Sequence, residues 1–177
     1  AFDPFGIWGP PVPKPVVLAL HGISYTLSIE LALASDIVVC ADDVRLRQLE
    51  IGRGIMPFGG ATLRAVPSLG WGNAMRFLLT AEEFGAAEAY RIGLVVDLVD
   101  DHALLDAALT KAHEVMRNAP FGVALTKEGM WSALEIPAMQ NAIDLENRQQ
   151  IMASATSDHR EAMAAFLERR PPDYKNA

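Results

Sequence analysis

The chain has 177 residues, of which 51% are hydrophobic and 21% charged, a composition typical of a globular protein with a buried core. Its formal net charge of −7, with 15 Lys and Arg residues spread along the sequence, argues against a surface that binds nucleic acid. One cysteine excludes an internal disulfide framework, and no apolar run approaches the roughly 20 residues of a membrane helix. We therefore expect a cytoplasmic protein without a nucleic-acid or membrane partner.

The first predicted elements form a strand, a helix and a second strand. Apolar, β-branched runs at residues 16–20 and 36–41 are typical of buried strands, and Cys40 in the second run is interpreted as a core residue. The helix formers of residues 27–35 lie between the two runs. This order predicts a crossover unit of the kind that builds parallel sheets.

The next elements are a strand, a loop and a short helix. The segment at residues 45–52 predicts a strand that ends at a glycine, and the Pro- and Gly-rich residues 54–60 predict a loop. A helix is expected from about residue 61 to residue 66, where Pro67 would end it.

The second half of the chain is predicted to be mostly helical, with one further strand at residues 94–99. The sequence accordingly predicts a strand-rich part at residues 1–100 and a helical region at residues 101–177. The predicted helices of this half are residues 73–80, 84–93, 102–119, 122–134, 137–154 and 158–170.

Most types of catalytic or binding site lack a signal in this sequence. The four histidines lie in unrelated segments without a cysteine cluster, so we expect no metal site. A serine-hydrolase elbow, G-x-S-x-G, and the glycine-rich loops that bind nucleotide phosphates are also absent. These absences leave paired carboxylates as the remaining candidates for chemistry.

Two glutamates, Glu30 and Glu50, lie in the largely apolar stretch of residues 21–60. A carboxylate in such a place costs desolvation free energy unless it has a partner or a task. Two structural alternatives remain open at this point. Glu30 would face solvent or pair with a basic neighbour, and Glu50 would pair with Arg45, Arg47 or Arg53.

Four segments, in this order, resemble the crotonase, or enoyl-CoA hydratase/isomerase, superfamily: "KPVVLALHG", "ELALASDIVVCADDVRLRQLEIGRGIMPFGG", "LLTAEEFGAAEAYRIGLVVDLV" and "TSDHREAMAAFLERRPPDYKN". The resemblance runs from Lys14 to the end of the chain. It implies an α/β fold, namely a crotonase-like ββα spiral with a helical C-terminal trimerisation region. It also implies that the N-terminal repeats of the family are absent from this chain.

The resemblance further implies a lyase of fatty acid metabolism that adds water across the double bond of a 2-enoyl-CoA. Glu30 and Glu50 match the two family glutamates that hold the reacting water, and the amide of Leu27 matches a donor of the oxyanion hole. Phe58 is expected to line the acyl pocket, and Phe166 and Arg169 match positions that touch the nucleotide end of coenzyme A. The implied substrate is an acyl-CoA thioester, no metal or other cofactor is implied, and the implied assembly is a homotrimer or hexamer.

Two other functions remain open. Isomerisation of the double bond requires only the glutamate at the position of Glu50 in many members of the superfamily. A non-catalytic subunit that binds acyl-CoA is the other alternative. It is favoured by residues 26–28, "TLS", which stand where the superfamily commonly has a glycine cluster.

Overall fold

The computed structural model describes residues 1–176 and forms two compact units. Unit 1 comprises residues 1–12 and 16–112, and unit 2 comprises residues 13–15 and the chain from residue 113 onward. Strands occur only in unit 1 of the described chain, and helices occur in both units. The division into residues 1–100 and 101–177 stays a prediction, because compactness alone does not define a domain.

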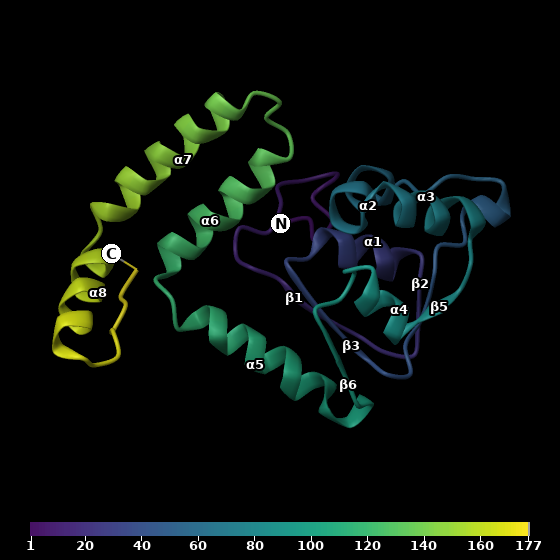
Figure 1. Ribbon diagram of the computed structural model, residues 1–177, viewed down its shortest axis with the longest axis horizontal. Coiled ribbons are helices and arrows are strands. Elements are labelled where there is room, and N and C mark those ends of the chain that lie inside the picture. The colour runs from purple at the N-terminus through teal and green to yellow at the C-terminus, as the bar shows by residue number, and fades with distance from the viewer. Residues whose placement is uncertain (177) are drawn as a thin grey trace. The chain divides into compact units, whose positions relative to one another are not determined.

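A parallel three-stranded sheet forms the centre of unit 1 (Figure 1). Its strands are β1 (Val17–Leu20), β3 (Ile37–Ala41) and β6 (Asp97–Val99), in the order β1-β3-β6. Helix α1 (Leu27–Ala34) lies between β1 and β3 in the sequence, which confirms the predicted strand–helix–strand crossover.

The central strand β3 has side chains packed on both faces of this sheet. Val38 and Cys40 belong to the large core that includes α1 and the helices of residues 61–91, whereas Val39 and Ala41 belong to a second cluster with Leu104. This alternation follows from the two-residue period of a strand. Cys40 is fully buried, as predicted for a core residue.

A second, smaller sheet contains β2 (Ile23–Tyr25), β4 (Arg45–Arg47) and β5 (Phe84–Gly85) in the order β2-β4-β5. Strand β4 is parallel to β2 and antiparallel to β5. The prediction of a strand over residues 45–52 is therefore wrong after Arg47. Glu50 has helical backbone angles, and the turn η1 (Ile51–Arg53) follows it and ends at Gly54 with φ 77°.

Helix α2 (Ala61–Leu69) is longer than predicted, because Pro67 lies inside it and does not end it. The missing N–H of Pro67 would have reached the carbonyl of Leu63. Both residues are exposed, so water can satisfy this carbonyl and the helix continues to Gly70. The other helical elements that begin in unit 1 are α3 (Trp71–Thr80), α4 (Ala86–Arg91), η2 (Asp101–Ala103) and α5 (Leu104–Met116).

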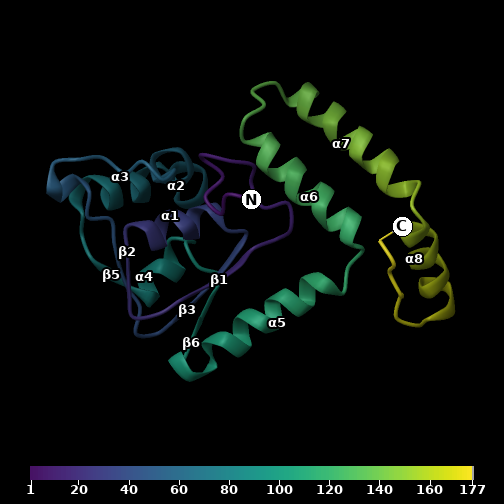
Figure 2. The same cartoon turned by 180° about the vertical axis from the view of Figure 1, so that it is seen from behind.

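Unit 2 contains three helices within the described residues: α6 (Pro120–Ala133), α7 (Met139–Ser154) and α8 (Ser157–Glu168). Each overlaps the span that its sequence pattern predicts, although α6 begins two residues and α8 one residue earlier than expected. Helices α6 and α7 lie side by side, as Figures 1 and 2 show. Helix α8 begins after Thr156, whose hydroxyl oxygen accepts a hydrogen bond from the His159 N–H.

Candidate active site

The first turn of α1 presents an unused backbone donor. Thr26, just before the helix, has φ 48° and ψ −103°, and its N–H donates to the carbonyl of Arg47 in β4. The Thr26 carbonyl accepts from the N–H groups of Ile29 and Glu30. Within residues 1–176 the Leu27 N–H has no acceptor. A free N–H at a helix start is suited to bind an oxygen that carries negative charge.

Glu30 lies in the same turn of α1, and its side chain is buried with 2% exposure. Its Oε1 accepts a hydrogen bond of 2.8 Å from the N–H of Gly59. A Cβ atom at position 59 would lie 2.1 Å from Glu30 Oε2, so only glycine allows this approach of backbone to carboxylate. The interpretation of Glu30 as a solvent-facing helix residue is therefore wrong.

The surroundings of Glu30 act on its pKa in opposite directions. Burial has the largest effect and raises the pKa of this carboxyl above its ordinary value of 4.5. Hydrogen bonding to the Gly59, Ala61 and Phe58 N–H groups at the start of α2 lowers the pKa, and the charge of Glu50 raises it. Because the net shift is upward, Glu30 holds a proton more readily than a free glutamate does.

Glu50 is also buried, but its carboxylate is held differently. It follows β4 in the sequence, and its Oε2 atom is buried without a hydrogen-bond partner in the described part of the chain. Arg45 pairs with Glu83, and Arg47 donates to the carbonyl of Ala81. The interpretation of Glu50 as the partner of these arginines is therefore wrong.

Gln48 was not singled out by the sequence and lies two residues before Glu50. Its side chain is fully buried, and neither its amide nitrogen nor its amide oxygen has a hydrogen-bond partner among the described residues. The available sequence signal is the two-residue period of β4. The alternation of burial continues past the end of this strand at Arg47, so Leu46, Gln48 and Glu50 are all buried.

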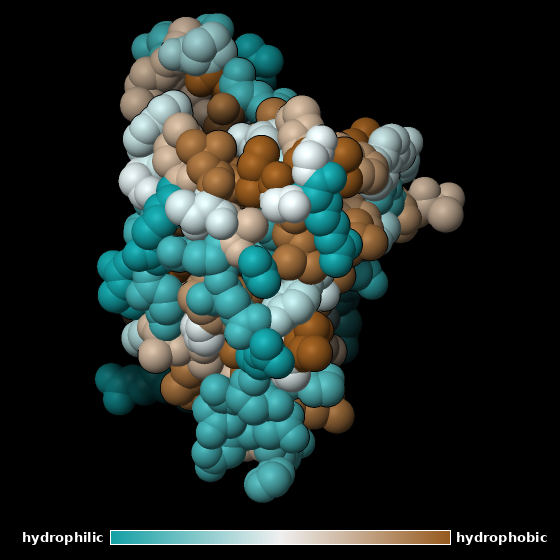
Figure 3. Space-filling model, turned by 90° about the vertical axis from the view of Figure 1, so that its right-hand side faces the viewer, coloured by the Kyte–Doolittle hydropathy of each residue, from teal (hydrophilic) through white to brown (hydrophobic). Residues whose placement is uncertain are grey.

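Phe58 lies one residue before the Gly59 donor, with 68% of its surface exposed. Its ring meets the Trp8 ring edge to face, with 6.2 Å between centroids, and Trp8 meets Phe5 at 6.3 Å. Apolar residues Ile55 and Met56 of the same loop are also exposed. Figure 3 shows apolar side chains at the surface on the side that faces right in Figure 1.

The other two predicted contact residues, Phe166 and Arg169, belong to unit 2 and are both exposed. Phe166 lies in the last turn of α8, and Arg169 ends that helix with φ 55°. The remaining predicted site residues belong to unit 1. Each unit therefore holds its own share of the predicted site.

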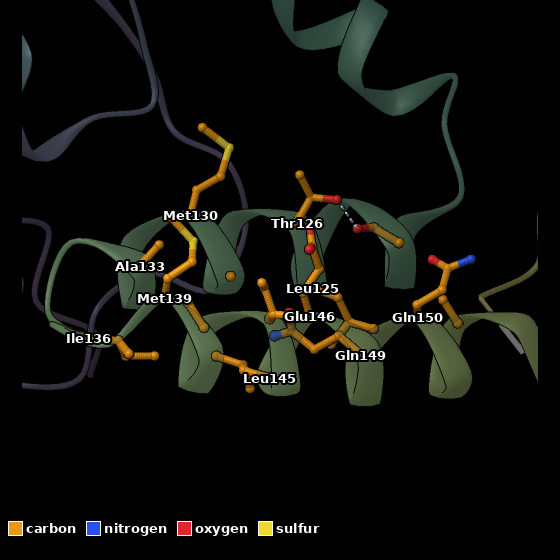
Figure 4. Close-up of a pocket in the computed structure, with 15 residues that line it drawn as sticks. Leu125, Thr126, Met130, Ala133, Ile136, Met139, Leu145, Glu146, Gln149 and Gln150 are labelled. Atoms are coloured by element: carbon orange, nitrogen blue, oxygen red, sulfur yellow. Dashed lines mark hydrogen bonds between the residues drawn. The ribbon is translucent and has the colours of Figure 1, made fainter.

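Unit 2 also contains a groove of about 400 Å³ between α6 and α7 (Figure 4). Most of its lining is apolar, and neither Glu30 nor Glu50 contributes to it. The buried Gln149 lines the groove, and its amide nitrogen has no partner within the described residues. The groove is a packing feature of two helices without a titratable pair.

Neither metal-ligand clusters nor membrane-length helices are found in residues 1–176. No group of three or more His, Cys, Asp or Glu side chains there is placed to hold a metal ion. No helix in that range is both long and apolar enough to cross a membrane.

The chain is similar to known proteins in both sequence and fold. Residues 11–177 match the family model for enoyl-CoA hydratase/isomerase. The chain superposes with a TM-score of 0.95 on a probable enoyl-CoA hydratase/isomerase from Mycobacterium abscessus, at 37% identity, covering 100% of this chain and 68% of that one. It therefore has the α/β crotonase fold and belongs to the enoyl-CoA hydratase/isomerase family.

Two curated relatives from Escherichia coli K12 differ in activity. The 2,3-dehydroadipyl-CoA hydratase is 33% identical over 92% of this chain and 63% of its own length. The 1,2-epoxyphenylacetyl-CoA isomerase is 31% identical over 92% of this chain and 62% of its own length. The chain thus spans somewhat less than two thirds of these relatives, and the family alone does not choose between hydration and isomerisation.

Proposed function

We propose that the protein hydrates a 2-enoyl-CoA, or dehydrates a 3-hydroxyacyl-CoA in reverse. The observation that carries this proposal is the pair of buried, electrostatically coupled carboxylates, Glu30 and Glu50, in the unit that also holds the free N–H of Leu27. Two like charges near each other disfavour double ionisation, so one carboxyl group can accept a proton while the other supplies one.

In this mechanism water lies between the two glutamates. One carboxylate takes a proton from the water as its oxygen bonds to C3 of the enoyl group, and the other carboxyl group gives a proton to C2. Negative charge develops on the thioester oxygen between these events, and the Leu27 N–H stabilises it. The proton taken from the water then passes to the second carboxylate, which restores both groups, so the elements of one water are added without a redox cofactor. We propose no metal for this reaction.

Three exposed residues supply the remaining contacts in this proposal. Phe58 directly precedes Gly59, which donates to Glu30, and would pack against the acyl chain. Phe166 and Arg169 would contact the nucleotide end of coenzyme A, where an aromatic ring and a guanidinium suit an adenine and a phosphate.

The proposed assembly is a cytoplasmic homotrimer or hexamer. Apolar side chains on the last helices are exposed in the single chain, among them Ile151, Met163 and Leu167. Burial of such residues against other copies would remove this surface from water. Light scattering of the purified protein would test the assembly, and a monomer at micromolar concentration would contradict it.

The test of the proposed activity is turnover of crotonyl-CoA, followed by loss of the enoyl-thioester absorbance. We expect Glu30→Gln and Glu50→Gln each to lower kcat by about 10²–10⁴, because each removes one group of the acid–base pair. The matched control is Glu135→Gln, which makes the same change at an exposed residue of unit 2 and should keep the parent rate. A parent that binds the CoA ester without turnover would contradict hydration and favour a non-catalytic subunit.

Double-bond isomerisation is the second candidate, favoured by the similarity to a curated isomerase. The distinguishing variant is Glu30→Ala, tested with both a 2-enoyl-CoA and a 3-enoyl-CoA. Isomerisation that persists in this variant while hydration is absent from the parent would establish the isomerase. Loss of both activities, or of hydration alone, would favour the hydratase.

A further inference from the structure

Gln48 is an unusual residue for the core of unit 1. Its side chain is fully buried, and both polar atoms of its amide lack a hydrogen-bond partner among the described residues. A primary amide carries two N–H donors and one acceptor oxygen, and leaving these groups unpaired in the interior destabilises the folded state. An apolar side chain of similar size would avoid this cost, so the amide calls for a functional explanation.

A complementary group lies two residues further along the chain. Residues 44–50 alternate strictly between buried even positions and less buried odd positions, so the side chains of Gln48 and Glu50 are both enclosed in the interior. Only Leu49 separates the two residues in the chain, so their long side chains can meet at their ends. Glu50 Oε2 is itself buried and lacks a donor within residues 1–176.

The two glutamates differ in what holds them. The Glu30 carboxylate is fixed by the N–H of Gly59, a backbone donor at the start of α2. The buried Oε2 atom of Glu50 has no donor within the described residues. The Gln48 amide is the nearest polar side chain in the sequence on the same side, and it has two unused N–H groups.

We propose that Gln48 is the positioning residue of Glu50: by rotation of its side chain, the amide nitrogen donates a hydrogen bond to the Glu50 carboxylate in the working enzyme. This bond fixes the carboxylate toward the reacting water. The role in turnover rests on the proposed hydratase activity, whereas the hydrogen bond and its effect on Glu50 do not.

The test is Gln48→Met, which keeps the volume of the side chain and removes its polar atoms. We expect kcat for crotonyl-CoA hydration to fall by about 10- to 100-fold while KM stays within about threefold, because the loss affects the reacting group more than substrate binding. We also expect the carboxyl ¹³C NMR signal of Glu50 to shift, since the carboxylate loses a hydrogen-bond donor. The signal is recorded on glutamate-labelled protein and assigned by its absence in Glu50→Gln.

Thermal unfolding separates positioning from packing. Gln48→Met should stay folded at the assay temperature, because it keeps the volume of the buried side chain. Gln149→Met is the matched control, a buried glutamine of unit 2 with an unpartnered amide nitrogen. It should leave kcat and the carboxyl NMR signal of Glu50 unchanged. If Gln48→Met does not fold, Gln48→Glu replaces it, with a donor only when protonated and so with activity relative to the parent that falls as pH rises.

The outcomes distinguish this inference from the proposed function. A parent without hydration but with a Glu50 carboxyl signal that shifts in Gln48→Met would refute the hydratase and support the hydrogen bond. An active parent whose kcat and Glu50 carboxyl signal are both unchanged in Gln48→Met would overturn the inference and leave the hydratase intact.

Discussion

The two buried carboxylates of unit 1 are accommodated by different means. The Glu30 carboxylate accepts a hydrogen bond from the N–H of Gly59, just before α2. No other residue fits at position 59, because its Cβ atom would collide with this carboxylate. Glu50 lies in the segment after β4, where its buried Oε2 atom has no donor in the described structure. The position of the Glu30 carboxylate depends on the space at a glycine, whereas that of the Glu50 carboxylate depends, in the proposal above, on a neighbouring side chain. The comparison shows that burial alone does not tell how a charged group is controlled.

The largest effect expected in this comparison comes from Gly59→Ala, which disturbs the hydrogen bond from the Gly59 N–H to the Glu30 carboxylate. The added Cβ would lie 2.1 Å from Glu30 Oε2, so the carboxylate must leave its present position. We expect kcat for crotonyl-CoA to fall by roughly 10²–10³, the cost typical of a displaced catalytic group. Steady-state kinetics with circular dichroism would check that the loss occurs in folded protein.

The control for this substitution is Gly72→Ala in α3, where a new Cβ would meet nothing within 4 Å. Alanine at this second residue of the helix should stabilise the protein by no more than roughly 0.5–1 kcal/mol and leave kcat unchanged. Equal activity losses in Gly59→Ala and Gly72→Ala would contradict a specific effect of Gly59 on the position of the Glu30 carboxylate.

A smaller effect is expected in the pH dependence of stability. Burial raises the pKa of Glu30 in the folded chain above its ordinary value of 4.5. Ionisation of Glu30 is therefore harder in the folded state than in the unfolded state. The resulting loss of stability is absent below about pH 4.5 and grows as pH rises through the folded pKa.

Glu30→Gln removes this loss and keeps an oxygen that can accept from Gly59. Its unfolding temperature, relative to the parent, should therefore increase as pH rises from about 4 toward neutral. Thermal unfolding at several pH values, with Glu135→Gln as the exposed control, would measure the difference. A difference that stays constant over this range would show that the Glu30 pKa is not raised.

The smallest effect is expected at Thr26, which adopts φ 48° immediately before α1. Thr26→Gly should relieve roughly 1–2 kcal/mol of backbone strain and cost about 0.5–1 kcal/mol in chain entropy, a net gain below about 1 kcal/mol. Because the Leu27 N–H keeps its direction, kcat should stay within about threefold. Chemical denaturation would measure the stability, and a large rise in kcat would show that Thr26 misaligns the donor.

Much of the fold could be predicted from local sequence patterns. The runs at residues 16–20 and 36–41 predicted β1 and β3, because buried strands are short, apolar and β-branched. The end of β4 and the helix through Pro67 were predicted wrongly. In both cases the decisive factor was local solvation or turn geometry, which hydrophobic pattern does not report.

The site was predictable only in part. Glu30 and Glu50 stood out as charges in an apolar stretch, and the structure shows both to be buried. The hydrogen bond from Gly59 to Glu30 joins residues 29 positions apart, a contact that no local pattern reveals. Gln48 was not predicted, because the sequence gives no signal that an uncharged polar residue just after a short strand is buried.

The burial of Cys40 makes this chain convenient for chemical labelling. Its thiol is the only one in the sequence, it lies in the central strand, and burial raises its pKa to about 11. A thiol-specific reagent at neutral pH should therefore modify the chain only when β3 opens, so the labelling rate reports how often the core of unit 1 is exposed. Because Cys40 does not react while β3 is closed, a cysteine introduced at the surface can carry a single dye or spin label in the native protein.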